Sequence, residues 1–142
     1  MFKLLVPIDG SECSLRALDH AIALACARES AELVLLHVNP DPIVYGEIQV
    51  YAEVGRIREL QMRQSEAVLG PAAEKAREAG VTCRTDIEQG DAATVIARHA
   101  DALRCGAIVM GTRGMSAIGN LLLGSVATKV VHLANVPVTL VK

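Results

Sequence analysis

The fold is decided by the stretch VMGTRGMSAIGNLLLGSV, which spans residues 109–126. The apolar run over residues 107–110 has the composition of a buried strand and stops at Gly111. A loop with further glycines follows, and an apolar pattern with helical spacing begins after Gly124 and Ser125. The stretch therefore predicts a strand, a glycine-rich loop and the start of a helix, in that order.

Such a loop favours the binding of an anion such as a phosphate group. Glycines let backbone N–H groups approach an anion closely, and the first N–H groups of a helix lack partners inside the helix. The helix dipole adds a partial positive charge at that end, and Arg113 adds a full charge with a planar fork of donors. The alternative is a purely structural loop, because most glycine-bearing loops in parallel sheets bind nothing.

Strand-like and helix-like patterns alternate along the rest of the chain. The predicted strands are Phe2–Ile8, Leu33–Val38, Val81–Glu88, Ala107–Met110 and Val136–Val141. The predicted helices are 14–26, 54–79, 91–103 and 125–133. This alternation predicts a three-layer α/β fold with a parallel sheet, in a single domain over residues 1–142. Ligands of such sheets bind beyond the carboxyl ends of the strands where the winding reverses, here at Asp9 and Gly111.

Local signals add expectations about the helices and about one connecting segment. Ser14, Asp91 and Ser125 are predicted to be N-caps. Pro71 lacks an N–H group and would clash with the carbonyl group four residues earlier, so a kink or a break is expected there. The segment Asn39–Glu53 contains two prolines and a glycine, and we expect an irregular, exposed loop of the length that is often functional.

The composition excludes several classes of function. The net charge is −2 and only 2% of residues are aromatic, so neither a phosphate-binding basic surface nor a base-stacking platform is expected, and we exclude nucleic acid as the main partner. No apolar stretch is long enough to span a membrane, and no leader peptide is visible. The four cysteines lack zinc or redox spacing and are expected to be free thiols in the cytoplasm.

Few side chains are candidates for catalysis. There is no P-loop lysine and no dinucleotide-binding fingerprint after the first strand. His37 lies inside an apolar strand and is expected to be a core histidine. Asp9 could hold a metal ion through water or contact a ribose hydroxyl, and its alternative role is that of a turn residue. The sequence indicates no other metal ligand.

Three segments together carry a family resemblance. Residues 111–125 follow the pattern G-x2-G-x9-G-S, residues 6–11 read VPIDGS, and residues 36–38 read LHV. These segments resemble the universal stress protein family, and the resemblance runs from Phe2 to Val141. In that family the glycine pattern marks the members that bind ATP.

The resemblance implies a sheet order of 3-2-1-4-5 in a Rossmann-like fold similar to that of the adenine nucleotide alpha hydrolases. It implies ATP across the carboxyl ends of the first and fourth strands, where Asp9 could hold Mg²⁺ through water beside the nucleotide. The residues that it assigns to nucleotide binding are Pro7, Ile8, Asp9, Val38, Met110, Gly111, Arg113, Gly114, Gly124, Ser125 and Val126. It also implies a homodimer formed through the last strand, Val136–Val141.

The sequence departs from the family at one position. Ala127 stands where ATP-binding relatives often carry a hydroxyl residue, which removes a hydrogen bond worth about 1 kcal/mol. The hydroxyl group of Thr128 is a candidate substitute.

Three functions remain in competition. The first is a cytoplasmic ATP-binding regulatory protein of the stress response, homodimeric, with slow or no hydrolysis. The second is an interaction module in which the glycine loop is only structural and the dimer or the Asn39–Glu53 segment carries the function. The third is a slow ATP hydrolase.

Overall fold

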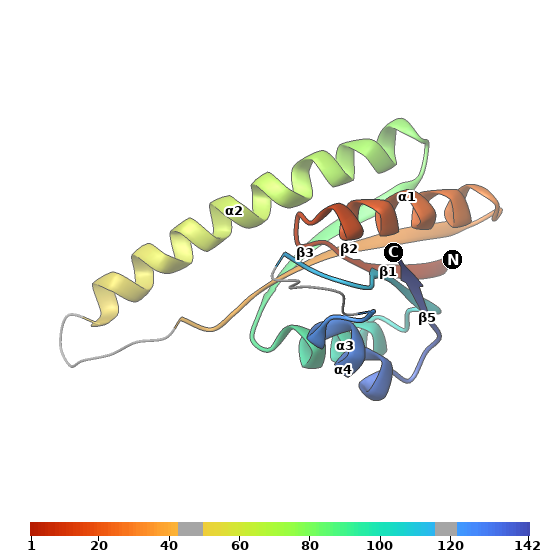
Figure 1. The fold of residues 1–142 in the computed structure, drawn as a ribbon. Coiled ribbons are helices and arrows are strands. Elements are labelled where there is room, and N and C mark those ends of the chain that lie inside the picture. Colours follow the sequence, from red (N-terminus) through yellow and green to blue (C-terminus); the bar gives the residue numbers. More distant parts are fainter. Residues whose placement is uncertain (43–49, 116–121) are drawn as a thin grey trace.

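The computed structural model describes residues 1–42, 50–115 and 122–142. Strands and helices alternate along these residues (Figure 1). In chain order they are β1 (Phe2–Pro7), α1 (Glu12–Cys26), β2 (Ala31–Asn39), α2 (Val50–Glu78), β3 (Thr82–Gln89), α3 (Ala92–Ala102), β4 (Ala107–Gly111), α4 (Ser125–Leu133) and β5 (Val138–Val141).

The five strands form one parallel sheet in the order β3-β2-β1-β4-β5, which confirms the predicted order. The chain starts in the middle of the sheet, winds outward to β3, and then returns to place β4 on the other side of β1. The winding therefore reverses between β1 and β4. The carboxyl ends of these two strands diverge into their helices on opposite faces, which opens a crevice above the sheet edge.

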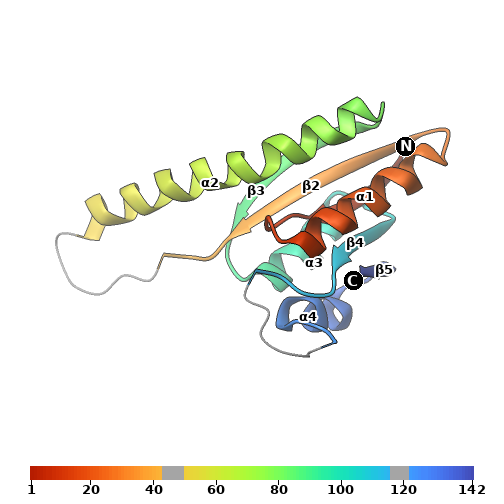
Figure 2. The same ribbon diagram turned by 45° about the horizontal axis from the view of Figure 1, so that its top comes forward.

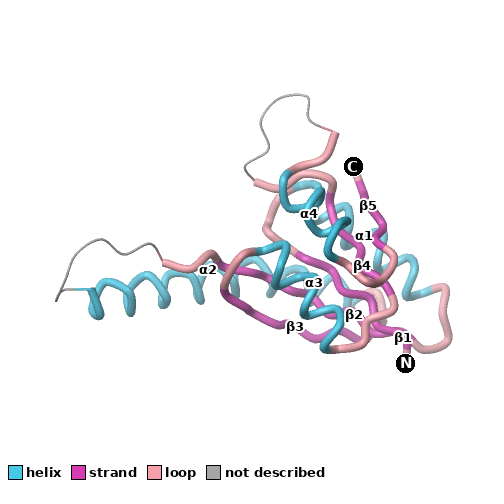
Figure 3. Tube along the Cα trace, turned by 90° about the horizontal axis from the view of Figure 1, so that it is seen from below, coloured by secondary structure: helices cyan, strands magenta, loops and turns pink. Residues whose placement is uncertain are grey.

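Helices cover both faces of the sheet, as the three-layer prediction requires (Figures 1 and 3). On one face α1 and α2 pack small residues such as Ala17, Ala21 and Ala76 against Leu33 and Leu35 of β2. The other face carries α3 and α4 in a separate buried cluster. Small helix residues bring the helices close to the strands, and this close packing explains how the chain builds its core with so few aromatic residues.

The two edge strands differ in detail from the prediction. β3 lies at one edge, as expected, but its exposure does not alternate throughout: Thr85 is exposed and Asp86 to Gln89 are all half-buried. β5 lies at the other edge, but it begins at Val138, so Pro137 precedes the strand instead of lying within it. The carbonyl group of Pro137 still accepts a hydrogen bond from Ile108 N at 2.9 Å. Proline can accept a hydrogen bond through its carbonyl group, but it has no N–H group to donate. It is therefore found at the start of a strand or on an edge strand, and here it comes directly before β5.

Of the kink or break expected at Pro71, the break is wrong, because α2 runs without interruption from Val50 to Glu78, and the kink stays a prediction. Ala67, whose carbonyl group loses its helical partner, is exposed, so water can satisfy that group. Beyond the proline, Ala72 and Ala76 are buried against the sheet and hold the helix in place. The amino-terminal half of α2 extends past the ends of the strands (Figure 2).

The early start of α2 also shortens the expected irregular loop. Residues 50–53 are helical, residues 39–42 are described as strand end and coil, and residues 43–49 lie outside the described residues. The predicted functional role of this segment therefore stays a prediction.

The N-cap of α1 is Ser11, not Ser14. Ser11 Oγ accepts a hydrogen bond from Ser14 N at 3.1 Å, and Ser14 Oγ donates to the Ser11 carbonyl group at 2.9 Å. Both serines carry a suitable hydroxyl group, and the turn at Gly10, with its φ of 85°, starts the helix earlier than its apolar pattern indicates. Asp91 caps α3 as predicted.

None of the described helices combines the length and apolarity needed to cross a membrane. The four cysteines carry free thiols, with Cys13 and Cys105 buried and Cys26 exposed.

Candidate functional site

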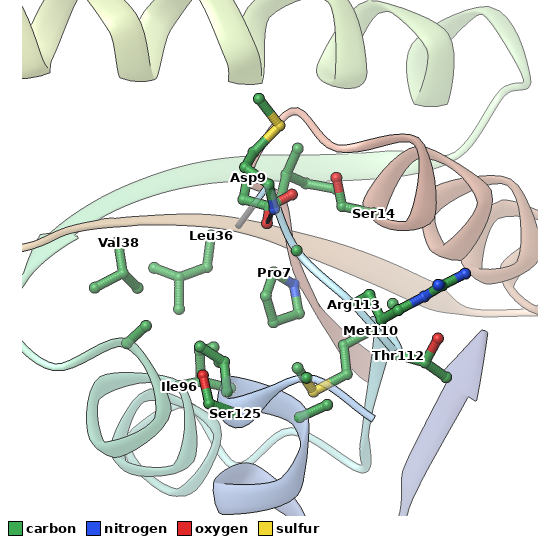
Figure 4. Close-up of a pocket in the computed structure, with 18 residues that line it drawn as sticks. Pro7, Asp9, Ser14, Leu36, Val38, Ile96, Met110, Thr112, Arg113 and Ser125 are labelled. Carbon is green, nitrogen blue, oxygen red and sulfur yellow. Dashed lines mark hydrogen bonds between the residues drawn. The ribbon is translucent and has the colours of Figure 1, made fainter. Parts of the chain in front are cut away.

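A cavity of about 410 Å³ lies where the winding reverses, above the carboxyl ends of β1 and β4. Its walls come from the ends of β1, β2 and β4, from the glycine loop, and from the first turns of α3 and α4 (Figure 4). This volume falls in the range of about 300–1,000 Å³ that is typical of small-molecule sites.

All the residues that the sequence assigned to a ligand site line this one cavity. They come from four segments, at residues 7–9, 38, 110–114 and 124–126. The fold therefore brings together side chains and backbone that lie far apart in the sequence, from Pro7 to Val126. Their placement is an observation, whereas their role in binding stays a prediction.

Sequence reasoning missed several wall residues of the cavity. They are Ser14, Leu36, Ala92, Ile96, Thr112 and Met115. Leu36 could have been found, because it lies two residues before Val38 and shares its face of the strand. Ala92 and Ile96 are four residues apart on one side of α3, but only the packing of α3 against the sheet shows that this side faces the cavity.

The cavity has an apolar end and a polar end. Leu36, Val38 and Ile96 form the apolar end, and Figure 4 shows them grouped on the side remote from Arg113. Asp9 and the glycine loop form the polar end, with the start of α4 beside them. A flat aromatic ring suits the apolar end, and a group that accepts many hydrogen bonds suits the polar end.

The start of α4 offers unpaired backbone donors to this polar end. The N-cap is Gly124, with φ −70° and ψ 168°, and no side chain of the described residues caps the helix. Ser125 is therefore the first helical residue, and its predicted role as N-cap is wrong. Since glycine carries no capping oxygen, the first N–H groups of α4 remain available to an external acceptor.

The glycine loop is fixed to its surroundings at both ends. Gly124 N donates to the Thr112 carbonyl group at 2.6 Å, and Thr112 N donates to the Val141 carbonyl group at 2.9 Å. A Cβ atom on Gly111 would lie 2.8 Å from Cys13 Cβ, so only glycine lets α1 pack this closely on the end of β4. These contacts fix Gly111, Thr112 and Gly124 between α1, α4 and β5.

A thiol lies directly behind the loop. Cys13 Sγ is 3.9 Å from Thr112 Oγ1 and accepts a hydrogen bond from Arg16 Nη2 at 3.3 Å. Burial by itself raises the pKa of this thiol, but the Arg113 backbone N–H, the Thr112 hydroxyl and the Arg16 charge outweigh burial, so the pKa lies below its ordinary value. This arrangement favours the thiolate form of Cys13.

Asp9 stands at the rim of the cavity and is half-buried. Its Oδ1 accepts a hydrogen bond from Ser11 N at 2.9 Å, and its Oδ2 accepts one from Met115 N at 3.2 Å. Among the described wall residues of the cavity it is the single carboxylate. No cluster of three metal-binding side chains occurs in residues 1–42, 50–115 and 122–142.

Two further expectations can be compared with the structure. His37 is a buried core histidine, as predicted, and its Nδ1 lies 2.7 Å from the Ile8 carbonyl oxygen. The hydroxyl group of Thr128 donates to the Gly124 carbonyl group at 2.9 Å and lies outside the cavity wall, so it does not replace the hydroxyl group missing at Ala127.

The sequence of this chain is similar to those of proteins from one known family. The sequence model of the Universal stress protein family matches residues 1–142. The chain is 38% identical over 146 residues to the universal stress protein YxiE of Bacillus subtilis (strain 168), covering 99% of this chain and 98% of the relative.

Solved structures share this fold. The hypothetical protein MJ0577 superposes with a TM-score of 0.87 at 27% identity, covering 99% of this chain and 95% of that protein. A universal stress protein in complex with cAMP superposes with a TM-score of 0.73, also at 27% identity, covering 99% of this chain and 97% of that protein. The fold and its winding reversal are thus shared over almost the whole chain.

Proposed function

The chain belongs to the universal stress protein family, and we propose that it binds an adenine nucleotide, ATP with Mg²⁺, in the cavity above β1 and β4. The observation that carries this proposal is the convergence of the glycine loop, Asp9 and Val38 on one cavity. The structure of a family member in complex with cAMP supports the class of ligand.

The two ends of the cavity fit the two ends of a nucleotide. The adenine ring would lie against Val38 and Ile96, since this end is apolar and offers backbone groups for the edge of the base. The phosphates would lie at the glycine loop, where the first N–H groups of α4 and the side chain of Ser125 are available. Pro7 and Met110 would border the ribose between these ends.

Magnesium fits this donor set as a companion of the phosphates. Mg²⁺ usually takes one or two carboxylates, keeps several waters and completes its shell with phosphate oxygens. Asp9 is the side chain that would hold it, directly or through water. A bound ion of this kind would neutralise phosphate charge beside the Asp9 carboxylate.

We propose that hydrolysis is slow or absent. No histidine is among the described wall residues of the cavity, and their single carboxylate, Asp9, already accepts two backbone hydrogen bonds. A fast hydrolase needs a base with a free oxygen or nitrogen within reach of the attacking water. Among the described walls, the carboxylate that would hold the magnesium ion is also the single candidate base, and we infer that this shared use keeps hydrolysis slow.

The remaining parts of the proposal concern the assembly and its role. The outer edge of β5 has no partner strand in the described sheet, and Val138–Val141 are only half-buried. We propose that a second copy pairs with this edge to form a homodimer that acts in the cytoplasm as a regulator of the stress response. Four free thiols suit a reducing compartment.

Position 124 allows a test with a matched control. Aspartate and asparagine are both good N-caps, so Gly124→Asp and Gly124→Asn should each preserve α4. The aspartate carboxylate would occupy the first N–H groups of α4 and repel phosphate. In calorimetric titrations with ATP and Mg²⁺, we expect the parent to bind, the asparagine variant to bind more weakly, and the aspartate variant not to bind.

Equal affinity in all three proteins would show that the phosphates do not lie at the start of α4. Absence of binding by the parent would favour the alternative, an interaction module that uses the same fold. Phosphate release by the parent above the level of the Gly124→Asp variant would instead indicate a slow hydrolase.

A further inference from the structure

The carboxylate of Asp9 joins two segments that are far apart in the sequence. One oxygen accepts the Ser11 N–H, at the entrance to α1, and the other accepts the Met115 N–H, in the glycine loop. Asp9 follows the end of β1, the central strand of the sheet. One side chain therefore links the central strand to the loop that follows β4.

As placed, the same carboxylate occupies the space that a side chain at position 114 would need. A Cβ atom there would lie 2.6 Å from Asp9 Oδ2, and its other neighbour within 4 Å is Asp9 Cγ at 3.8 Å. The backbone of Gly114 is not in the left-handed region, so its conformation alone does not require glycine. Among the described residues, Asp9 is thus the group that collides with any larger residue at this position.

Gly124 belongs to the same sequence motif but faces a different constraint. A Cβ atom there would lie 3.4 Å from the Thr112 carbonyl oxygen and 3.5 Å from Arg113 Cα, which are ordinary contacts. Its φ of −70° is open to any residue. A Cβ atom therefore fits at Gly124 among the described residues, whereas at Gly114 it requires the Asp9 carboxylate to move.

We infer that Asp9 is a positioning residue that holds the glycine loop at Met115, and that its carboxylate is what restricts position 114 to glycine. The inference rests on the proposed function only in treating the loop as part of the nucleotide site. Residues 111–115, held in this way, present their N–H groups in one arrangement, which lowers the cost of ordering this part of the loop when a ligand binds.

The first test is a double-mutant cycle of Asp9→Ala and Gly114→Ala, measured by thermal unfolding in buffer without nucleotide. Gly114→Ala alone should lower Tm by about 3 °C. The double variant should be no less stable than Asp9→Ala alone, because removing the carboxylate removes the collision. Additive losses of Tm would overturn the inference.

The second test separates the loop contact from a general loss of structure. In Asp9→Asn, Oδ1 can still accept the Ser11 N–H, whereas the amide NH2 cannot accept the Met115 N–H. Hydrogen exchange should become roughly tenfold faster at the Met115 amide, the effect of losing one hydrogen bond, and stay unchanged at Ser11. Equal changes at both amides, or none at Met115, would overturn the inference.

Both measurements are made without nucleotide. They therefore decide the role of Asp9 even if ATP titrations fail, and a failed ATP titration by itself contradicts only the proposed function.

Discussion

Arg16 Nε donates a hydrogen bond to the main-chain carbonyl group of Lys142 at 2.6 Å, which ties α1 to the carboxyl end of β5. The same guanidinium donates from Nη2 to the sulfur of Cys13 at 3.3 Å. Cys13 in turn contacts Thr112 at the base of the glycine loop. One arginine thus connects the free edge of the sheet with the back wall of the candidate site.

Arg16→Gln should raise the pKa of the Cys13 thiol. Burial raises this pKa, the Arg113 backbone N–H and the Thr112 hydroxyl lower it, and the Arg16 charge and hydrogen bond lower it further. Removal of the charge removes one of the contributions that stabilise the thiolate. The measurement is a pH titration of the Cys13 ¹³Cβ chemical shift, with Arg16→Lys as the control that keeps the charge.

The same shift predicts how stability depends on pH. The folded-state pKa of Cys13 lies below its unfolded value, so the unfolded state binds more protons and stability should rise as pH increases between these two values. Arg16→Gln should reduce this rise. A Cys13 signal that titrates at or above the ordinary thiol pKa in the parent would contradict the account.

Asp91 should support stability until strongly acid pH. Hydrogen bonds from the Thr94 side chain, from Lys129 Nζ at 2.9 Å and from the Thr94 backbone lower the pKa of Asp91 from 3.8 to about 2. A depressed pKa means that the stabilisation is complete above pH 3.8 and is lost as pH falls through about 2. Lys129 belongs to α4, so this contact also connects α4 to the start of α3.

The comparison variant is Asp91→Asn, which can still cap α3 but cannot form the ion pair. Thermal unfolding between pH 5 and pH 2 should show a steeper loss of Tm in the parent than in the variant. Parallel curves would mean that the Asp91 carboxylate does not stabilise the fold through its charge.

Ala127→Ser should strengthen ATP binding about fivefold, because it restores one hydrogen bond worth about 1 kcal/mol. Ala127 is 2% exposed, so the new hydroxyl group should slightly lower Tm in nucleotide-free protein. Thr128→Ala is the matched control, since the Thr128 hydroxyl group donates to the Gly124 carbonyl group and lies outside the cavity wall. Calorimetric titration should show a changed affinity for Ala127→Ser and an unchanged one for Thr128→Ala; the reverse pattern would refute the assignment.

Ser65→Ala should lower the free energy of unfolding by about 2 kcal/mol, the penalty of an unsatisfied buried amide. Ser65 Oγ accepts from Asn39 Nδ2 at 2.8 Å and donates to the Gln61 carbonyl group at 2.8 Å. Both side chains are buried, and Asn39 follows Val38 in the candidate site. Urea unfolding measures the loss, with the exposed Glu66→Ala on the same helix as control. Equal stability of the two variants would contradict the role of this hydrogen bond.

Much of the fold follows from local pattern. Leu33–Leu36 are fully buried, as a continuous apolar run predicts for a central strand, and β3 lies at an edge, as expected. The predicted break at Pro71 failed because helix continuity there depends on Ala72 and Ala76 packing on the sheet, which is a tertiary effect.

In the candidate site, too, some residues could be predicted from local sequence and others depend on how the elements pack. The loop residues that line the cavity could be predicted from the glycine motif, because a backbone that approaches a ligand closely requires glycine. Ile96 and Ala92 escaped detection, since their helix pattern is that of ordinary core residues and only the crossover of α3 brings them to the cavity. Asp9 and Gly114 are far apart in the sequence and meet because β1 and β4 are neighbours in the sheet, so no sequence spacing reveals their contact.

The most direct test of the central claim is thermal unfolding of purified protein, shown by mass spectrometry to be free of co-purified nucleotide, with and without millimolar ATP and Mg²⁺. A ligand that binds only the folded state raises its apparent stability by about 2.7 kcal/mol at a hundredfold excess over Kd. The account predicts a rise in Tm of several degrees in the parent and none in Gly124→Asp. An unchanged Tm in the parent would contradict nucleotide binding.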